Sequence, residues 1–432
     1  MMKEVNDIKA EYKKTYKQMG WLMSYNLILV VTSLIDISCA SFISDDAVIS
    51  LTIACSIYHL MFSAYRIFCR AFRVIASKYY GAKDEESETS ALTMTTMLSC
   101  TVSVVVAIMM IIFGKNIIGL FNMTVEQSND AYAYLMTRLP GYCLYSFTNP
   151  IKRAMEAKGK NAIVTRVELI NLLNIPFSLL FMQFWGLVGI GCATSLVVVF
   201  DLLLVLCLFK PKYGKWNGRI LAEVTKTGLS YLPECTLVPI ISTITTNLCL
   251  IYLSVSAMVI SQIVHEFYDN NIVDIMYMCT QTAETNIGRE YGANNKEGIR
   301  KEFKIFKHCY VCMLLWHIPI TGVIGYIYFE FFTGIEDIGL ALLLLMFYIV
   351  ALVPYYIGIA ASRILYVYNI IKPVMIARVV GLVILEIPIQ YIAFILGADI
   401  FCIPISYLLA DLPWCVTNTV LLKKLKLNTV EM

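Results

Sequence analysis

A few charged and ionisable side chains lie inside stretches that are otherwise apolar, and these are the residues whose types could do chemistry. Asp36 stands in the middle of the apolar stretch 19–43. A carboxylate at the centre of a membrane helix costs roughly 2.5–3.5 kcal/mol on insertion scales, so it is seldom kept without a role. Asp36 is therefore a candidate for binding and releasing a proton, and a hydrogen-bonded structural aspartate is the alternative.

Three arginines follow a helical spacing in the next apolar stretch. Arg66, Arg70 and Arg73 lie at i, i+4 and i+7, which places them within about 60° of one another on a helix. His59 falls on the same stripe. If Lys78 marks the membrane border, Arg66 lies about 18 Å deep. Two interpretations stay open: the stripe binds an anion through guanidinium groups, or internal carboxylates neutralise it.

The elements that position these residues are membrane-spanning helices. Hydrophobic residues make up 59% of the chain and the mean hydropathy is +0.70, against roughly 45–50% apolar residues in soluble domains. Stretches of about 20 apolar residues recur along the chain, and they predict an all-α integral membrane protein of about twelve helices. The stretches are 19–43, 46–77, 90–113, 130–156, 162–183, 186–209, 225–253, 256–288, 307–330, 337–366, 372–396 and 399–422.

Charged residues are distributed unequally between the loops on the two sides of the predicted membrane. Lys and Arg gather at the N-terminus and in the loops after alternate spans, whereas the other loops carry mainly Asp and Glu. This is the positive-inside pattern, and it predicts an even number of spans with both termini in the cytoplasm. The net charge of +3 therefore reflects topology, and we expect no nucleic-acid partner.

Part of the sequence occurs twice, 211 residues apart. Residues 48–50 (Val-Ile-Ser) return at 259–261, and residues 80–82 (Tyr-Gly-Ala) return at 291–293. This repeat predicts two six-helix bundles related by a pseudo-two-fold axis around a central cavity that opens to each side in turn. The predicted parts are a cytoplasmic segment 1–18, an N-lobe 19–209, a cytoplasmic linker 210–224, a C-lobe 225–422 and a cytoplasmic tail 423–432.

The two copies differ in charge. Asp36 corresponds to Asn247, and Arg73 corresponds to Glu284. We expect a basic N-half wall and an acidic C-half wall, and a pair between Arg73 and Glu284 could act as a gate. Glu386 could instead pair with Arg378. The predicted lining of the substrate cavity is His59, Arg66, Arg70, Arg73, Asp274, Glu284 and Glu386.

The repeated Tyr-Gly-Ala motif predicts a turn at the end of the second span of each half. Gly81 and Gly292 are expected to end their helices in a left-handed or open conformation, with charged residues following in water. The linker 210–224 contains Pro, Gly and Lys, and we expect it to be solvated.

The chain shows little sign of metal or enzyme chemistry. Its 14 cysteines are scattered, and Cys309 and Cys312 next to His308 form a weak signal, because no second pair completes a zinc site. No HExxH, GxSxG or P-loop motif occurs. We expect no enzyme activity and no cofactor, with a possible Na⁺ at Asp36 as the one metal.

Five segments, taken in order and spacing, resemble the multidrug and toxic compound extrusion (MATE) transporters, within the superfamily that also contains oligosaccharidyl-lipid and polysaccharide flippases. The similarity extends over nearly the whole chain. The matching segments are 34–36, 76–84, 153–160, 186–194 and 287–295.

The resemblance implies a cation-coupling site in the first half. In the family this site uses an aspartate of span one, an asparagine and an aspartate one turn apart in span five, and a threonine of span six. The corresponding residues here are Asp36, Asn174 and Thr194, but the position of the span-five acid is Ser178. The missing carboxylate favours H⁺ over Na⁺ as the coupling ion.

The resemblance implies a secondary transporter that exports organic solutes or drugs by cation-coupled antiport and alternating access. The alternative is a flippase or exporter of an anionic or lipid-linked precursor, which the arginine stripe would suit. The expected partners are a small organic solute and membrane lipids. We expect a monomer in a plasma membrane, the inner membrane of a bacterium.

Overall fold

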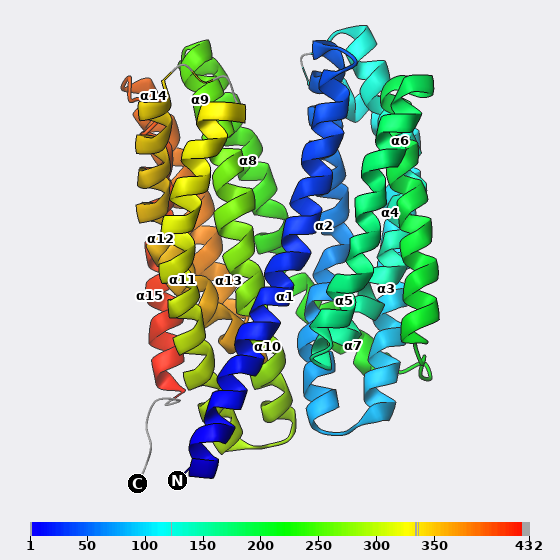
Figure 1. Ribbon diagram of the computed structural model, residues 1–432, viewed down its shortest axis with the longest axis vertical. Helices are drawn as coiled ribbons and strands as arrows, with labels where there is room; N and C mark the ends of the chain where they lie inside the picture. Colours follow the sequence, from blue (N-terminus) through cyan, green and yellow to red (C-terminus); the bar gives the residue numbers. More distant parts are fainter. Residues whose placement is uncertain (1, 122, 333–334, 336, 426–432) are drawn as a thin grey trace. The chain divides into compact units, whose positions relative to one another are not determined.

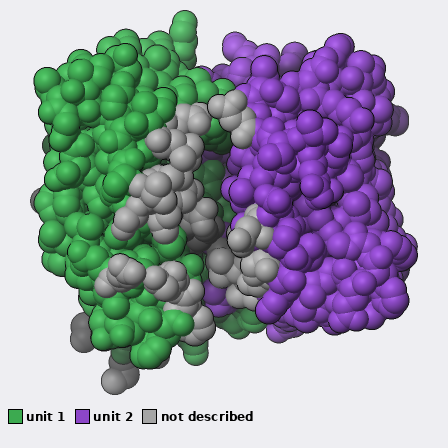
Figure 2. Space-filling view, turned by 90° about the horizontal axis from the view of Figure 1, so that it is seen from above, with its two compact units in different colours: residues 1–23, 237–432 green, residues 24–236 purple. Residues whose placement is uncertain are grey.

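The computed structural model describes residues 2–121, 123–332, 335 and 337–425, and these residues form helices joined by short turns, with no strand among them (Figure 1). The all-α architecture agrees with the prediction. The chain divides into two compact units: unit 2 comprises residues 24–236, and unit 1 comprises residues 1–23 and 237–432 (Figure 2).

Unit 2 contains six long helical passages among the described residues. The α5–η1–α6 run counts as two passages, because α6 breaks at Gly186, whose φ of 55° and ψ of −133° are not helical. The elements are α1 (Met2–Ser41, from Ser24 on), α2 (Asp45–Gly81), α3 (Glu85–Ile118), α4 (Val125–Ala157), α5 (Asn161–Glu168), the 3₁₀ turn η1 (Leu169–Leu173), α6 (Asn174–Phe209) and the short α7 (Gly218–Ser230).

Unit 1 also contains six long passages among its described residues. Two of these passages include a π-helical turn, η2 (Asp269–Val273) and η3 (Val380–Glu386). The other elements are α8 (Leu232–Tyr252, from Leu237 on), α9 (Val255–Tyr268), α10 (Asp274–Gly292), α11 (Lys296–Phe332), α12 (Ile338–Val367), α13 (Lys372–Val379), α14 (Ile387–Ile395) and α15 (Cys402–Lys424).

Seven helical segments in the described part of the chain are long and apolar enough to cross a membrane by length and composition. One of them, 161–209, has 49 residues and breaks at Gly186, so it supplies two of the twelve passages. The helix α4 is absent from the seven because Arg138 and several Tyr and Thr residues keep its mean hydropathy low. A hydropathy criterion therefore misses a span that contains several polar residues.

The units differ from the predicted lobes at the N-terminus. Residues 2–18 are not a separate segment, because α1 runs without interruption from Met2, and its first part packs in unit 1. Gln18 accepts a hydrogen bond from Asn286 Nδ2 at 3.1 Å, and Glu11 pairs with Lys301 at 2.7 Å.

The units differ from the predicted lobes at the linker as well. Residues 218–230 form the helix α7, which buries Ile220, Val224 and Gly228 at a spacing of four residues. Most residues from 210 to 217 are exposed, in agreement with a solvated linker, and the Gly214 amide donates to the Thr89 carbonyl at 3.1 Å. A side chain at position 214 would collide with α3, because an added Cβ would lie 2.5 Å from the Ser90 nitrogen. The glycine therefore permits close packing rather than flexibility.

Gly81 and Gly292 are the last residues of their helices, as predicted. The prediction that they adopt a left-handed or open conformation was wrong, because the positive φ falls two residues later, at Lys83 (58°) and Asn294 (54°). The closing hydrogen bonds match, from Asp84 N to Tyr79 O and from Asn295 N to Glu290 O, both at 3.0 Å. These are Schellman motifs, which satisfy the last carbonyls of a helix.

Two further left-handed positions repeat at nearly the same offset. Gly159 (75°) corresponds to Asn369 (59°), and Gly186 (55°) corresponds to Gly397 (80°). The repeat is therefore visible in the backbone, in addition to the few residues that the halves share.

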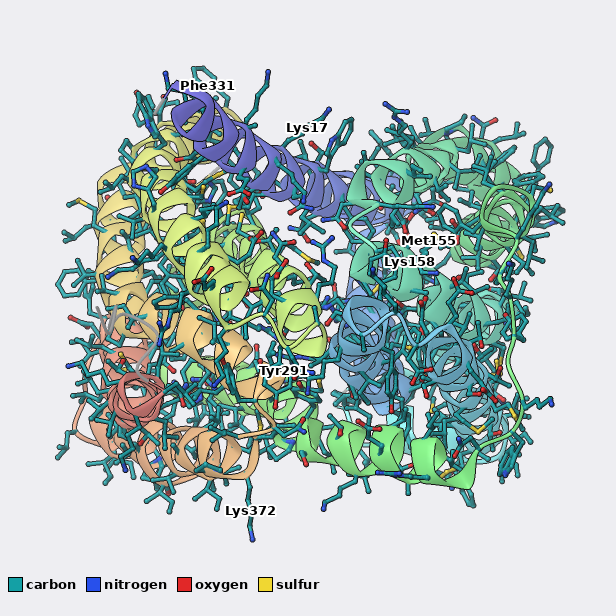
Figure 3. All side chains as sticks on the ribbon, turned by 90° about the horizontal axis from the view of Figure 1, so that it is seen from below. Lys17, Met155, Lys158, Tyr291, Phe331 and Lys372 are labelled. Carbon is teal, nitrogen blue, oxygen red and sulfur yellow. The ribbon has the colours of Figure 1, made fainter. Side chains whose placement is uncertain are left out.

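Within each unit, the turns at one end of the helices contact one another. In unit 2, Lys158 after α4 pairs with Glu88 of α3 at 2.7 Å. In unit 1, the ring of Tyr291 at the end of α10 packs edge-on against Tyr368 after α12, with centroids 5.0 Å apart. Lys158 and Tyr291 are labelled in Figure 3. Equivalent turns are thus held by an ion pair in one repeat and by an aromatic contact in the other.

Candidate functional site

Asp36 lies in α1 with only 7% of its surface exposed, and three neutral side chains surround its carboxylate. Its Oδ1 accepts hydrogen bonds from Asn174 Nδ2 at 2.8 Å and from Ser178 Oγ at 3.3 Å. Thr194 Oγ1 lies 3.5 Å from Oδ2 and 3.1 Å from Asn174 Oδ1. The structure therefore brings together the four residues named for cation coupling, while their role in coupling stays a prediction.

The local structure of α5–η1–α6 explains how three of these residues reach Asp36. Asn174 and Ser178 lie one turn apart, directly after the 3₁₀ turn η1. Irregular turns inside helices are often found at functional positions. The π-helical η3, ending at Glu386, occupies the corresponding place in the second repeat.

Two close backbone contacts hold Thr194 in place. The break at Gly186 redirects α6, and a Cβ on Gly189 would lie 2.2 Å from the Phe181 carbonyl oxygen. A Cβ on Gly191 would lie 2.0 Å from Thr137 Oγ1 of α4. At position 189 only glycine fits without a shift of the backbone, whereas at position 191 a larger residue would displace the Thr137 side chain.

Arg138 of α4 is a site residue that sequence reasoning missed. Its Nη1 lies 3.6 Å from Asp36 Oδ2 and donates a hydrogen bond to the Tyr134 hydroxyl. The guanidinium also lies over two rings, 4.3 Å from the Tyr58 centroid and 5.5 Å from the Tyr134 centroid. The available signal was its position, because Arg138 is a rare cation on the side that carries few of them.

The arginine stripe does not act as one group. Arg70 Nη2 pairs with Glu234 Oε1 at 2.7 Å, and its guanidinium lies 4.9 Å from the Tyr231 ring centroid. Arg73 Nη1 lies 3.8 Å from Glu156 Oε2. For these two arginines the structure supports neutralisation by internal carboxylates.

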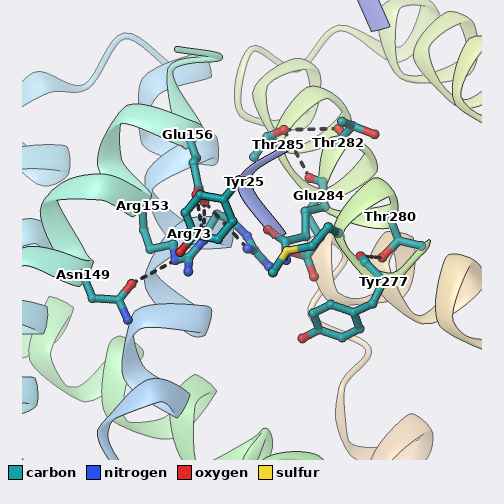
Figure 4. Close-up of polar contacts among 12 residues, drawn as sticks. Tyr25, Arg73, Asn149, Arg153, Glu156, Tyr277, Thr280, Thr282, Glu284 and Thr285 are labelled. Carbon is teal, nitrogen blue, oxygen red and sulfur yellow. Dashed lines mark hydrogen bonds and ion pairs between the residues drawn. The ribbon is translucent and has the colours of Figure 1, made fainter. Parts of the chain in front are cut away.

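Glu156 is shared with a second arginine. Arg153 Nη1 donates to both oxygens of Glu156, at 2.7 and 2.8 Å, and Arg153 Nε donates to Asn149 Oδ1 at 3.0 Å (Figure 4). Arg73, Arg153 and Glu156 thus form a buried cluster in unit 2.

Arg66 and His59 differ from the rest of the stripe because both side chains are exposed. The Arg66 guanidinium lies 5.7 Å from the Phe62 ring centroid. Among the described residues no carboxylate lies within 4 Å of it. A charged group in the middle of a span is costly in hydrocarbon, which predicts an aqueous space beside this part of α2.

A buried lysine joins three elements of unit 2. Lys152 Nζ of α4 lies 2.5 Å from Glu168 Oε1 of α5 and 2.8 Å from Asp201 Oδ2 of α6, and all three side chains are at most 2% exposed. The lysine also lies 5.0 Å from the Tyr145 ring centroid. This triad ties α4 to α5, which leads into Asn174, and to the second half of α6, which carries Thr194.

In unit 1 the predicted cavity acids separate into different environments. Glu284 Oε1 pairs with Arg363 Nη1 at 2.7 Å, and both side chains are fully buried. Asp274 is exposed. Since Glu284 and Arg73 each have a partner within their own unit, the pair between them as a gate stays a prediction.

Glu386 is buried, with 6% of its surface exposed. Arg378 hydrogen-bonds Asp411 of α15, and it also interacts electrostatically with Glu386. The alternative that Glu386 pairs with Arg378 therefore stays a prediction. The side chain of Asn247, the counterpart of Asp36, lies outside the described residues.

Groups of three or more His, Cys, Asp and Glu side chains placed to hold a metal do not occur in the described part of the chain. His308 Nε2 lies 3.6 Å from Cys312 Sγ, and its ring packs edge-on against Tyr12 with centroids 5.2 Å apart. These contacts account for His308 as a packing residue of α11.

Comparisons with known proteins agree with the geometry. The sequence profile of the MatE family matches residues 22–180 and 235–392, one segment in each repeat and more than half of the chain. A comparison with curated proteins found no match.

Several solved structures share the fold at low sequence identity. A MATE protein in the straight conformation superposes with a TM-score of 0.84 at 15% identity, covering 96% of both chains. An outward-facing multidrug resistance MATE transporter of the MOP superfamily gives 0.83 at 15% identity, covering 97% of both. A MOP superfamily transporter from Pyrococcus furiosus, described as having a binding pocket of reverse polarity, gives 0.83 at 14% identity and 97% of both. The profile match and the shared all-α membrane fold together show that this chain belongs to the MatE family of multi-pass membrane transporters.

Proposed function

We propose that this protein is a proton-coupled antiporter that exports organic solutes, with Asp36 as the residue that binds and releases the proton. The observation that carries the proposal is the buried Asp36 carboxylate, held by neutral donors on α6. A carboxylate in such a place is expensive unless it has a function. Family membership supports transport of small organic molecules, and the coupling ion and the antiport mechanism are our inference.

Protonation of Asp36 would change the hydrogen bonds that connect α1 to α6. The ionised Oδ1 accepts bonds at 2.8 and 3.3 Å, and hydrogen bonds to a charged group contribute about 1.5–3 kcal/mol each. Protonation removes the charge but leaves an oxygen that can accept, so each bond weakens towards the roughly 0.5–1.5 kcal/mol of a neutral hydrogen bond and the balance changes by about 2–3 kcal/mol. Inversion of a two-state population from 1:99 to 99:1 takes about 5.5 kcal/mol. Proton binding at this cluster would therefore bias a conformational equilibrium without inverting it alone.

Flux driven by an imposed pH gradient in proteoliposomes tests the proposal. We expect Asp36→Asn to abolish this flux while solute binding to the purified protein persists. Asp130→Asn, an exposed acid of α4, serves as the matched control and should transport normally. Unimpaired pH-driven flux in the Asp36 variant would contradict the proposal. Flux driven by a Na⁺ gradient alone would identify Na⁺ as the coupling ion in place of H⁺.

An anionic solute is the second candidate, and the exposed Arg66 favours it. A guanidinium in the middle of a span, without a carboxylate within 4 Å among the described residues, can attract an anion. Export of an anionic and of a cationic fluorescent dye should be compared in wild type and Arg66→Ala. We expect the variant to lose preference for the anion, and an unchanged preference and rate would eliminate this candidate. Because Arg70 and Arg73 have internal partners, a phosphate-binding stripe for a lipid-linked precursor is less well supported.

We further propose a plasma-membrane location with both termini in the cytoplasm and a monomeric state. The support is the concentration of Lys and Arg at the N-terminus and in alternate turns. Labelling of single cysteines introduced near Lys3 and Lys424 tests the orientation. Modification by an impermeant reagent from outside the cell would contradict it.

A further inference from the structure

Arg138 gives the Asp36 site an internal cation. Its Nη1 lies 3.6 Å from Asp36 Oδ2, and the arginine side chain is 13% exposed. The other groups at the carboxylate, from Asn174, Ser178 and Thr194, are neutral. The site thus holds one negative and one positive charge, and it is electrically balanced before any coupling ion arrives.

The remaining ionisable groups around the pair leave this balance unchanged while they are neutral. They come from each packed element: Cys39 from α1, Cys55, Tyr58 and His59 from α2, and Tyr134 from α4. α5 and α6 contribute only the neutral partners of Asp36.

We propose that Arg138 is the resident counter-ion of Asp36 and that it makes this site selective for protons over Na⁺. A metal cation entering here would meet a carboxylate that is already compensated and a guanidinium that repels it. A proton avoids this difficulty, because it binds covalently to a carboxylate oxygen and removes the negative charge.

The released guanidinium then has another place to bind. It already lies 4.3 Å from the Tyr58 ring centroid and donates to the Tyr134 hydroxyl. Cation–π contacts stabilise a desolvated cation by about 2 kcal/mol. Tyr58 on α2 and Tyr134 on α4 can therefore retain Arg138 after Asp36 is protonated, so that proton binding transfers Arg138 from the carboxylate to the rings.

Position 178 carries a serine and not an acid. Its Oγ lies 3.3 Å from Asp36 Oδ1, so an acid at this position would place a second carboxylate beside the first. With Arg138 removed as well, two carboxylates and the Asn174 and Thr194 oxygens would face one point. Oxygen ligands of this kind suit a hard cation. The pair of residues Arg138 and Ser178 would then decide which cation binds.

The inference rests on proton coupling at Asp36, and two readouts on full-length protein test it. The first is the pH midpoint of flux in proteoliposomes, for which we expect Arg138→Gln to raise the midpoint by roughly one to three units. Arg138→Lys keeps the charge and should stay near wild type. Lys115→Gln, an exposed cation over the Tyr132 ring, is the control and should leave the midpoint unchanged.

The second readout is thermal stability of the purified protein in NaCl against choline chloride at equal ionic strength. Wild type should show no specific Na⁺ effect, and Arg138→Gln combined with Ser178→Asp should become more stable in Na⁺. An unchanged pH midpoint in Arg138→Gln, or Na⁺ stabilisation of the wild type, overturns the inference. This Na⁺ readout does not depend on transport, so failure of proton coupling in the Asp36→Asn test is distinguishable from failure here.

Discussion

Replacement of Lys152 by methionine should destabilise unit 2 strongly. The substitution keeps most of the side-chain length and removes the charge, which leaves Glu168 and Asp201 buried without their cation. Arg153 cannot substitute, because its Nη1 is bonded to both oxygens of Glu156.

The expected magnitude follows from the burial. Removal of one partner from a buried ion pair costs about 3–5 kcal/mol, because an uncompensated charge remains. For a unit of residues 24–236, each kcal/mol corresponds to roughly 2–4 °C in melting temperature. We therefore expect the melting temperature of Lys152→Met to fall by roughly 6–20 °C.

Thermal unfolding of purified full-length protein in detergent is the assay. Lys160→Met, at an exposed lysine just after α4, is the matched control and should change little. Combining Lys152→Met with Glu168→Gln and Asp201→Asn removes the stranded charges and should restore much of the stability. A fall no larger than that of the control, or no recovery in the triple variant, would refute the reasoning.

Two further changes test local features. Gly191→Ala should lower the free energy of unfolding by about 1–3 kcal/mol through overpacking, because the new Cβ would lie 2.0 Å from Thr137 Oγ1. It should also lower transport per folded molecule. Melting temperature and flux are compared with those of Gly20→Ala, where nothing lies within 4 Å of the added Cβ. Asp84→Ala should cost about 1 kcal/mol near pH 7 through loss of the α3 cap, where Asp84 accepts from the Ser87 amide at 3.0 Å. This hydrogen bond lowers the pKa of Asp84, so the contribution is full above the ordinary pKa of about 3.9 and is lost as the pH falls through the lowered value. Melting curves of wild type and variant should converge in acid, and a constant difference at all pH values would contradict the account.

Much of the fold could be predicted because apolar length and loop charge are local properties of the sequence. Long apolar runs indicated helices, and the 211-residue repeat indicated two bundles, which the matched left-handed residues show in the backbone. The turn residue was misplaced because Schellman geometry sets the positive φ by hydrogen bonding, and Lys83 adopts it without being glycine.

The candidate site was predictable only in part. Asp36, Asn174, Ser178 and Thr194 were named together through a family resemblance, and the structure places them in contact. Arg138 was missed because its sequence position indicates topology, whereas its contact with Asp36 depends on how α4 is rotated against α1.

By itself, the sequence determined the residue types and their order along the helices: an acid in α1, arginines in α2, and acids in the second half. Only the tertiary structure decided which charge meets which. Arg378 hydrogen-bonds Asp411 of α15, and Arg70 pairs with Glu234. The physical reason is that an ion pair needs contact within about 4 Å, and such contacts depend on helix rotation and axial shift. Those quantities are set by the packing of the whole unit, where close contacts such as Gly191 against Thr137 leave little freedom.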